Sequence, residues 1–178
     1  MWEKKMRGNS GFSLFEVLTV IAIIAVVAAI AVPNMIAWRN RAKLGEGARD
    51  IYSAFQLARS GAAKENADVI VSFDTSVTQG GDFIVFIDDG GGIDADDDGV
   101  IDDADNGQAD PDTETIFKIG KLPSGVTIDY TALSIKKVTF SSNGLLKTGF
   151  GLTVKVLSTS GEEREVVVSS AGRVRIAY

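Results

Sequence analysis

The sequence contains neither histidine nor cysteine. Serine and cysteine nucleophiles that depend on a histidine base are therefore excluded, and so are zinc sites built from nitrogen and sulfur ligands. Without cysteine there are no disulfides, so a packed core or a bound metal must stabilise the 178 residues. Most familiar enzyme chemistry is thereby excluded.

Basic residues are missing from residues 88–114, which hold 12 of the 24 acidic residues of the chain. The formal net charge of -6 therefore comes from this one segment. The rest of the chain is mildly basic, but it lacks the cationic stripe that is typical of nucleic-acid-binding proteins.

Charge of either sign is missing from residues 17–38, a run of 22 positions. At about 1.5 Å per residue, roughly 20 apolar residues cross the approximately 30 Å hydrocarbon layer of a membrane. A buried helix is disfavoured because so small a protein could not surround it. A secretory signal peptide is disfavoured because no small-residue cleavage site closes the run. We expect a transmembrane helix that Pro33 kinks or loosens without ending it.

A second helical pattern follows over residues 39–64. Its small and apolar residues recur at alternating spacings of 4 and 3, which places them on one stripe of a helix. These residues are Leu44, Ala48, Ile51, Phe55, Ala58 and Ala62. Gly45 and Gly47 each weaken a helix by about 1 kcal/mol, so a bend or local melting is expected near them.

The hydrophobic period changes to two after this helix, and eight short segments alternate as strands do. They are residues 69–73, 83–87, 116–119, 126–130, 138–140, 152–157, 165–169 and 173–178. Glycine-containing turns separate many of them. The expected fold class is α+β, with a long N-terminal helix packed on an antiparallel β-sandwich. The expected divisions are a leader (1–11), a membrane-spanning half-helix (12–38), an amphipathic helix (39–64) and a β-domain (65–178) with an acidic loop (88–114).

The segment from Gly11 to Val17 reads GFSLFEV, and it lies between a short basic leader and the uncharged run. This arrangement resembles the class III signal of type IV pilins and type II secretion pseudopilins. The resemblance implies that a prepilin peptidase cuts after Gly11 and that Phe12, the new N-terminal residue, is N-methylated. The family's glutamate corresponds to Glu16.

Three later segments resemble the minor-pseudopilin group typified by secretion protein H and the related FimT pilins. They are Leu57-Ala58-Arg59-Ser60, Phe140-Ser141-Ser142-Asn143-Gly144 and Ser170-Ala171-Gly172-Arg173-Val174. The acidic segment departs from the usual pattern of this group. For Gly172-Arg173, a hairpin turn and a contact with a partner protein are equally compatible with the sequence.

Glu16 lies near the start of the apolar run and needs a partner. A carboxylate inside a membrane segment costs up to about 2.5 to 3.5 kcal/mol on insertion scales. If the chain is cut after Gly11, the amine of Phe12 becomes the nearest positive charge. Residues 12 and 16 are one helical turn apart, so a bridge within one chain is possible, whereas the resemblance implies a bridge to the adjacent subunit. Snorkelling of Glu16 to the membrane surface is the alternative.

Residues 94–105 have the spacing of an EF-hand-like calcium loop. Acidic residues occupy loop positions 1, 3, 5, 9 and 12, glycine occupies position 6, and a backbone carbonyl serves at position 7. The candidate ligands are Asp94, Asp96, Asp98, Val100, Asp102 and Asp105. Position 12 is aspartate rather than glutamate, and the flanks read as loop rather than helix. A solvated acidic loop without metal is the alternative.

The resulting functional hypothesis is a structural subunit that catalyses nothing: a minor pseudopilin at or near the tip of a type II secretion pseudopilus. The resemblance implies other pseudopilins, the prepilin peptidase and the inner-membrane assembly platform as partners, and a periplasmic β-domain. The alternative is a type IV pilus minor pilin that binds DNA during uptake. Its candidate contacts are Arg173, Arg175, Lys136, Lys137 and Lys147. An uncleaved leader would instead favour a membrane-anchored calcium-binding module.

Overall fold

The structure is a computed structural model that describes residues 12–74, 78, 80–88, 115–129, 136–147 and 149–177. The chain divides into two compact units, Met1–Arg39 and Asn40–Tyr178. One helix, α1 (Leu14–Glu65), runs from the first unit into the second. It joins the two predicted helical segments, and neither Pro33 nor the glycine pair ends it.

Both ends of α1 carry capping interactions. The Oγ of Ser13 accepts a hydrogen bond from the backbone amide of Glu16 at 3.2 Å, which makes Ser13 the N-cap. At the other end Asn66 adopts a φ of 53°, and the amide of Ala67 donates to the carbonyl of Ala62 at 3.3 Å. This is the bond of a Schellman motif, with asparagine in place of the usual glycine.

The predicted stripe of α1 is confirmed, because all six of its residues are buried. Gly47 is a weak helix former beside that stripe, and its contacts explain why a larger residue does not stand there. A β-carbon on Gly47 would lie 2.9 Å from Cγ1 of Val126 and 3.5 Å from Cγ1 of Val156. Glycine lowers the helix propensity at this position, as expected, but close packing on the strands requires a residue without a side chain.

All eight predicted strands are present, with ends within two residues of the expected ones. They are β1 (Asp68–Ser72), β2 (Phe83–Asp88), β3 (Ile116–Gly120), β4 (Val126–Asp129), β5 (Lys137–Phe140), β6 (Leu152–Ser158), β7 (Glu163–Val168) and β8 (Val174–Ala177). Five glycines in the turns have positive φ, between 72° and 85°, as the turn chemistry requires. They are Gly80, Gly125, Gly144, Gly161 and Gly172.

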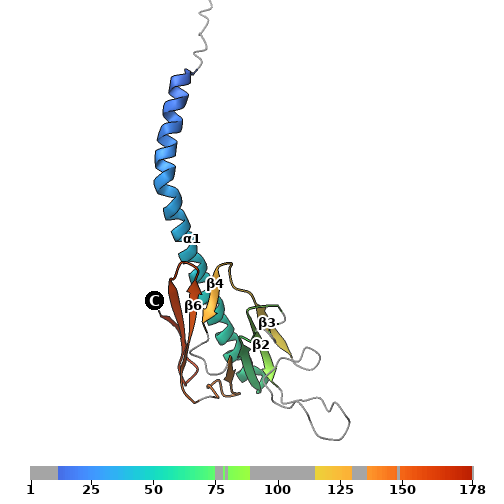
Figure 1. Cartoon of the computed structure of the whole chain (residues 1–178). Coiled ribbons are helices and arrows are strands. Elements are labelled where there is room, and N and C mark those ends of the chain that lie inside the picture. Colours follow the sequence, from blue (N-terminus) through green and yellow to red (C-terminus); the bar gives the residue numbers. More distant parts are fainter. Residues whose placement is uncertain are drawn as a thin grey trace, which may run out of the picture. The chain divides into compact units, whose positions relative to one another are not determined.

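The strands form two antiparallel sheets. The first sheet has the order β3-β2-β1-β5, and the second sheet has the order β4-β6-β7-β8. Figure 1 shows β2 and β3 of the first sheet, and β4 and β6 of the second, beside the second half of α1. Both sheets and the stripe of α1 contribute side chains to one buried cluster. The predicted α+β class, a long helix packed on antiparallel sheets, is confirmed.

Strands β1 and β2 of the first sheet are buried on both faces, which simple alternation does not predict. Val69 and Val71 of β1 face the cluster shared with α1. Ile70 lies on the opposite face with Ile84 and Phe86, and these three form a second buried cluster. The main core begins at Leu44, so the unit Asn40–Tyr178 contains a complete core of its own.

Candidate assembly site

The N-terminal turn of α1 places Phe12, Ser13 and Glu16 together. Phe12 precedes the helix and is 81% exposed, while Glu16 lies in the first turn. The helix therefore begins two residues later than predicted, because Ser13 caps it from outside. A carboxylate in the first turn also interacts favourably with the positive end of the helix dipole. Gly11, the predicted cleavage position, lies outside the described residues.

Sequence reasoning missed the capping role of Ser13. The signal was present, since serine followed three residues later by glutamate is the signature of a capping box. The structure shows one half of this box, the bond from the amide of Glu16 to Ser13. In the described part of the chain, no hydrogen bond or ion pair engages the carboxylate of Glu16. That carboxylate is exposed and available to a partner.

The first half of α1 exposes every large apolar side chain from Phe12 to Trp38, and the least exposed, Val17, is 44% accessible. The helix is long and apolar enough to cross a membrane. Thr19, the polar hydroxyl within this stretch, donates to the carbonyl of Phe15 at 2.9 Å and so satisfies itself within the helix. This surface can be covered only by lipid or by other protein.

The five residues predicted as DNA contacts are divided between the two sheets. Lys136 and Lys137 lie at β5 of the first sheet, whereas Arg173 and Arg175 lie at β8 of the second. Lys136 forms an ion pair with Asp74 at 3.5 Å. The remaining lysine, Lys147, pairs with Asp68 at 2.8 Å. Lys136 and Lys147 therefore already have carboxylate partners, which reduces the charge available to a phosphate backbone.

The two arginines differ from those lysines. Both side chains are exposed, and the amide of Arg173 donates to Oγ of Ser169 at 3.1 Å. Within the described residues, neither guanidinium takes part in an ion pair. Gly172 itself lies in the turn between β7 and β8, with a φ of 72°, so the hairpin-turn interpretation of Gly172-Arg173 is confirmed.

The predicted calcium loop, residues 94–105, lies outside the described residues, so its six candidate ligands cannot be placed. They belong to the connection between β2 and β3, which are antiparallel neighbours. The described ends of this connection are joined by a hydrogen bond from the amide of Ile87 to the carbonyl of Thr115 at 3.0 Å. Among the described residues, no group of three or more acidic side chains is placed to bind a metal.

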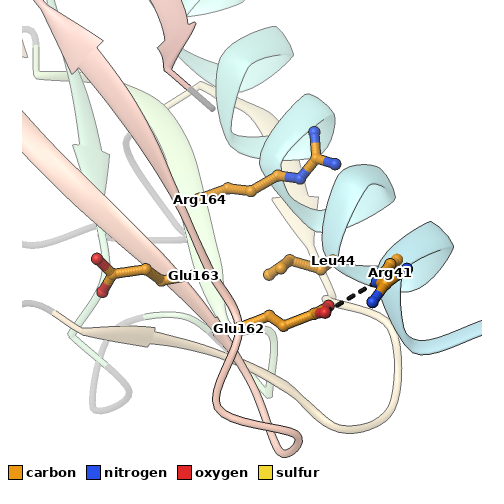
Figure 2. Close-up of a pocket in the computed structure, with 5 residues that line it drawn as sticks. All are labelled: Arg41, Leu44, Glu162, Glu163 and Arg164. Atoms are coloured by element: carbon orange, nitrogen blue, oxygen red, sulfur yellow. Dashed lines mark hydrogen bonds and ion pairs between the residues drawn. The ribbon is translucent and has the colours of Figure 1, made fainter. Parts of the chain in front are cut away.

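A recess that the sequence did not predict lies beside the first turns of α1 in the second unit. It has a volume of about 370 Å³ and is lined by Arg41, Leu44, Glu162, Glu163 and Arg164. Nε of Arg41 donates to Oε1 of Glu162 at 2.9 Å, as Figure 2 shows. This hydrogen bond, together with the negative charge of Glu162, raises the pKa of Arg41 above its usual value.

These features define a pilin-like filament subunit: a helix with an exposed apolar first half, a single carboxylate in its first turn, and a second half packed on antiparallel sheets. The chain belongs to the family described as type II transport protein GspH, whose sequence model matches residues 47–172. The prokaryotic N-terminal methylation motif matches residues 6–32, a stretch that contains Gly11, Phe12 and Glu16. This family consists of structural subunits rather than enzymes.

The solved structure of a minor pilin shows the same fold. The minor pilin FimU of Pseudomonas aeruginosa is 21% identical in sequence, with 79% of this chain and 92% of FimU covered and a TM-score of 0.51. The minor pseudopilin EpsH from the type 2 secretion system of Vibrio cholerae is 15% identical, with 76% of this chain and 96% of EpsH covered and a TM-score of 0.45. A search among curated proteins finds no significant match.

Proposed function

We propose that this protein is a minor pseudopilin of a type II secretion pseudopilus, placed at or near the tip of the filament. The observation that carries the proposal is the exposure of every large apolar side chain from Phe12 to Trp38, in a chain whose β-domain has a core of its own. An apolar rod attached to a self-sufficient folded unit suits a subunit that is stored in lipid and then polymerised. The match to the GspH family supports secretion over pilus biogenesis.

Assembly exchanges one apolar environment for another. In the bilayer, lipid covers the first half of α1, and in a filament the helices of neighbouring subunits replace that lipid. Because these environments are similar, hydrophobic transfer contributes little net free energy, and specific contacts must guide the exchange. Glu16 provides such a contact, since the N-methylated amine of Phe12 on an adjacent subunit neutralises its carboxylate.

The proposed life cycle gives each partner a position. The inner membrane holds the chain with its leader in the cytoplasm and its β-domain in the periplasm. The prepilin peptidase then cuts after Gly11, and the assembly platform transfers the subunit into the filament. Mass spectrometry of the protein from its native host tests this cycle. A mature chain starting at N-methylated Phe12 is expected, and retention of Met1 or a different start would refute it.

A type IV pilus minor pilin that binds DNA is the second candidate. The observation in its favour is that Arg173 and Arg175 lie exposed on β8, and among the described residues neither has an ion-pair partner. Gel-shift titrations of the unit Asn40–Tyr178 distinguish the candidates. Affinity that falls steeply with salt would favour DNA uptake, and its absence favours secretion.

We also propose that the connection between β2 and β3 binds calcium. Support comes from the spacing of its aspartates and from their mutual repulsion, which a divalent cation would relieve. This proposal is independent of the assembly function, because it concerns a different part of the chain.

A further inference from the structure

We propose that Asn143 is a deamidation site that is blocked while the turn around it is closed and that reacts once this turn opens. The reaction needs no enzyme and no cofactor, only water. The inference does not rest on the proposed function, because it concerns a turn of the unit Asn40–Tyr178 and not the N-terminal half of α1. It gives the chain an irreversible modification that occurs only in molecules in which this turn has opened.

The chemistry follows from the pair Asn143-Gly144. Asparagine deamidates most readily before glycine, because glycine has no side chain to shield its backbone nitrogen. The amide nitrogen of Gly144 gives up its proton to solvent and attacks Cγ of Asn143. A succinimide ring forms as the bond from Cγ to the side-chain nitrogen breaks, and ammonia leaves. Water then opens the ring at either carbonyl, which gives aspartate or isoaspartate.

Asn143 and Gly144 lie in the turn that follows β5. The amide of Gly144 donates to the carbonyl of Ser141 at 2.7 Å, and the amide of Ser141 donates to the carbonyl of Leu145 at 2.9 Å. Gly144 has a φ of 74°, as expected for the glycine that completes a three-residue hairpin loop. The side chain of Asn143 is exposed, so the water that hydrolysis requires can reach it.

Two hydrogen bonds keep the reacting atoms from meeting. The nucleophile is the amide nitrogen of Gly144, and its N–H is directed at the carbonyl of Ser141. The electrophile is Cγ of Asn143, and the neighbouring Oδ1 accepts a hydrogen bond from the amide of Leu145 at 3.0 Å. Attack requires both bonds to break and the peptide plane between residues 143 and 144 to rotate.

Arg59 and the turn between β7 and β8 hold Gly144 in place. Gly144 is buried, and a β-carbon on it would lie 3.5 Å from Cγ and 3.5 Å from Nε of Arg59. A β-carbon on Gly172 would collide with the carbonyl oxygen of Gly144, so the second turn lies directly against the first. We call this meeting of Arg59 with the two turns the junction. Gly144 cannot rotate unless the junction opens.

Opening of the junction is a smaller event than unfolding. Phe140, the last residue of β5, belongs to the main core, whereas the reacting pair lies beyond the strand. Regions of this kind open locally without loss of the whole fold. Breaking two hydrogen bonds of ordinary net strength reduces the open population by about 30-fold. We therefore expect Asn143 to react about 30-fold more slowly in the folded chain than in a free peptide.

The reaction prevents the turn from closing again in its original form. Isoaspartate places one extra carbon in the backbone between Ser141 and Gly144, so the 2.7 Å hydrogen bond between these residues cannot form as before. The tightly packed junction has no room for the longer chain at Gly144. A molecule that has reacted to isoaspartate therefore keeps a disrupted junction.

The test follows deamidation of the full chain in detergent micelles in mildly alkaline buffer. Mass spectrometry measures the conversion of amide to acid in the tryptic peptide Val138–Lys147, and a synthetic peptide of the same residues gives the unprotected rate. The other Asn-Gly pair, Asn106-Gly107, lies outside the described residues and is released in a different tryptic peptide. We expect the folded chain to react at least about tenfold more slowly than the synthetic peptide. Equal rates would overturn the proposal.

Variants establish that the junction controls the rate. Arg59→Ala removes the side chain that packs on Gly144, and Gly172→Ala forces a carbon against the carbonyl of Gly144. Both should speed deamidation of the folded chain at least about fivefold, whereas Arg59→Lys keeps the aliphatic stem and should change it little. Unchanged rates in both alanine variants would overturn the proposal.

Gly161→Ala separates local opening from global unfolding. Gly161 has a φ of 82°, and nothing lies within 4 Å of the position its β-carbon would take. The variant therefore strains a turn away from the junction and lowers the stability of the whole unit. Deamidation of Asn143 should proceed at the wild-type rate in this variant. Acceleration there would mean that Asn143 reacts only from the unfolded chain, which would overturn control by the junction.

Discussion

Arg59 of α1 lies against Gly172 in the turn between β7 and β8, so closely that a β-carbon on Gly172 would be 3.2 Å from Nε of Arg59. The same side chain passes Gly144, where a β-carbon would be 3.5 Å from its Cγ. A hydrogen bond from the amide of Leu146 to the carbonyl of Ser170, at 3.3 Å, joins the two turns. This junction connects the helix to the turn after β5 of the first sheet and to the turn between β7 and β8 of the second sheet.

The first prediction concerns the glycine at this junction. Gly172→Ala would place a carbon into the carbonyl oxygen of Gly144 and against Arg59, at a φ of 72° that disfavours alanine. We expect a loss of about 3 kcal/mol in the free energy of unfolding, combining backbone strain with overpacking. Urea unfolding of the fragment Asn40–Tyr178 measures it.

Gly161→Ala is the matched control for that prediction. Gly161 has a similar φ of 82°, but nothing lies within 4 Å of the position its β-carbon would take. Only the backbone strain remains at this position, and we expect the free energy of unfolding to fall by about 1 kcal/mol. If the two variants lose the same stability, the junction does not restrict Gly172, and the close packing of Arg59 has no energetic consequence.

Local periodicity was enough to predict most of the fold. The stripe from Leu44 to Ala62 and all eight strands follow from residues within one element, because each element must bury a face of its own. Local periodicity did not predict that both faces of β1 are buried. Ile70 lies opposite Val69 and Val71, and only the tertiary structure decides whether a second face is covered.

The candidate sites differ in the same way: those made of residues close in sequence could be predicted, and those made of distant residues could not. The processing motif is contiguous, so its resemblance to the pilin signal was enough to predict roles for Phe12 and Glu16. The recess could not be predicted, because Arg41 and Glu162 are 121 residues apart. The three segments that resembled the family were recognised one by one, but the sequence did not show that Arg59, Gly144 and Gly172 meet in space.

A second prediction contrasts two glycines of α1. Gly45→Ala should stabilise the fragment by up to about 1 kcal/mol, because alanine favours the helix and the nearest atoms would be 3.9 Å from its β-carbon. Gly47→Ala brings the same gain in propensity but forces a carbon to 2.9 Å from the stiff side chain of Val126. Thermal unfolding should show a higher Tm than the wild type for Gly45→Ala and no increase in Tm for Gly47→Ala. A higher Tm for Gly47→Ala would mean that the contact with Val126 relaxes easily.

A third prediction tests calcium binding. Calorimetric titration of the fragment Asn40–Tyr178 with calcium should give saturable uptake by millimolar concentrations. Asp94→Asn combined with Asp98→Asn removes two candidate ligands and should abolish uptake. Asp110→Asn combined with Asp112→Asn makes the same charge change outside the loop spacing and should preserve it. Absence of uptake by the unmodified fragment would reject the site and favour a solvated acidic loop.

The last prediction separates the two roles that the structure allows for Glu16. Glu16→Ala removes the carboxylate that neutralises a neighbouring amine, so we expect normal membrane insertion but at least tenfold less cross-linking to other pilin-like subunits. Ser13→Ala removes the N-cap, at a cost of about 1 kcal/mol to the first turn, and leaves that carboxylate in place. Its cross-linking should remain near the wild-type level, measured in the native host after membrane fractionation. Equal defects in the two variants would mean that Glu16 acts by shaping the helix start, whereas normal cross-linking of Glu16→Ala would remove its role in assembly altogether.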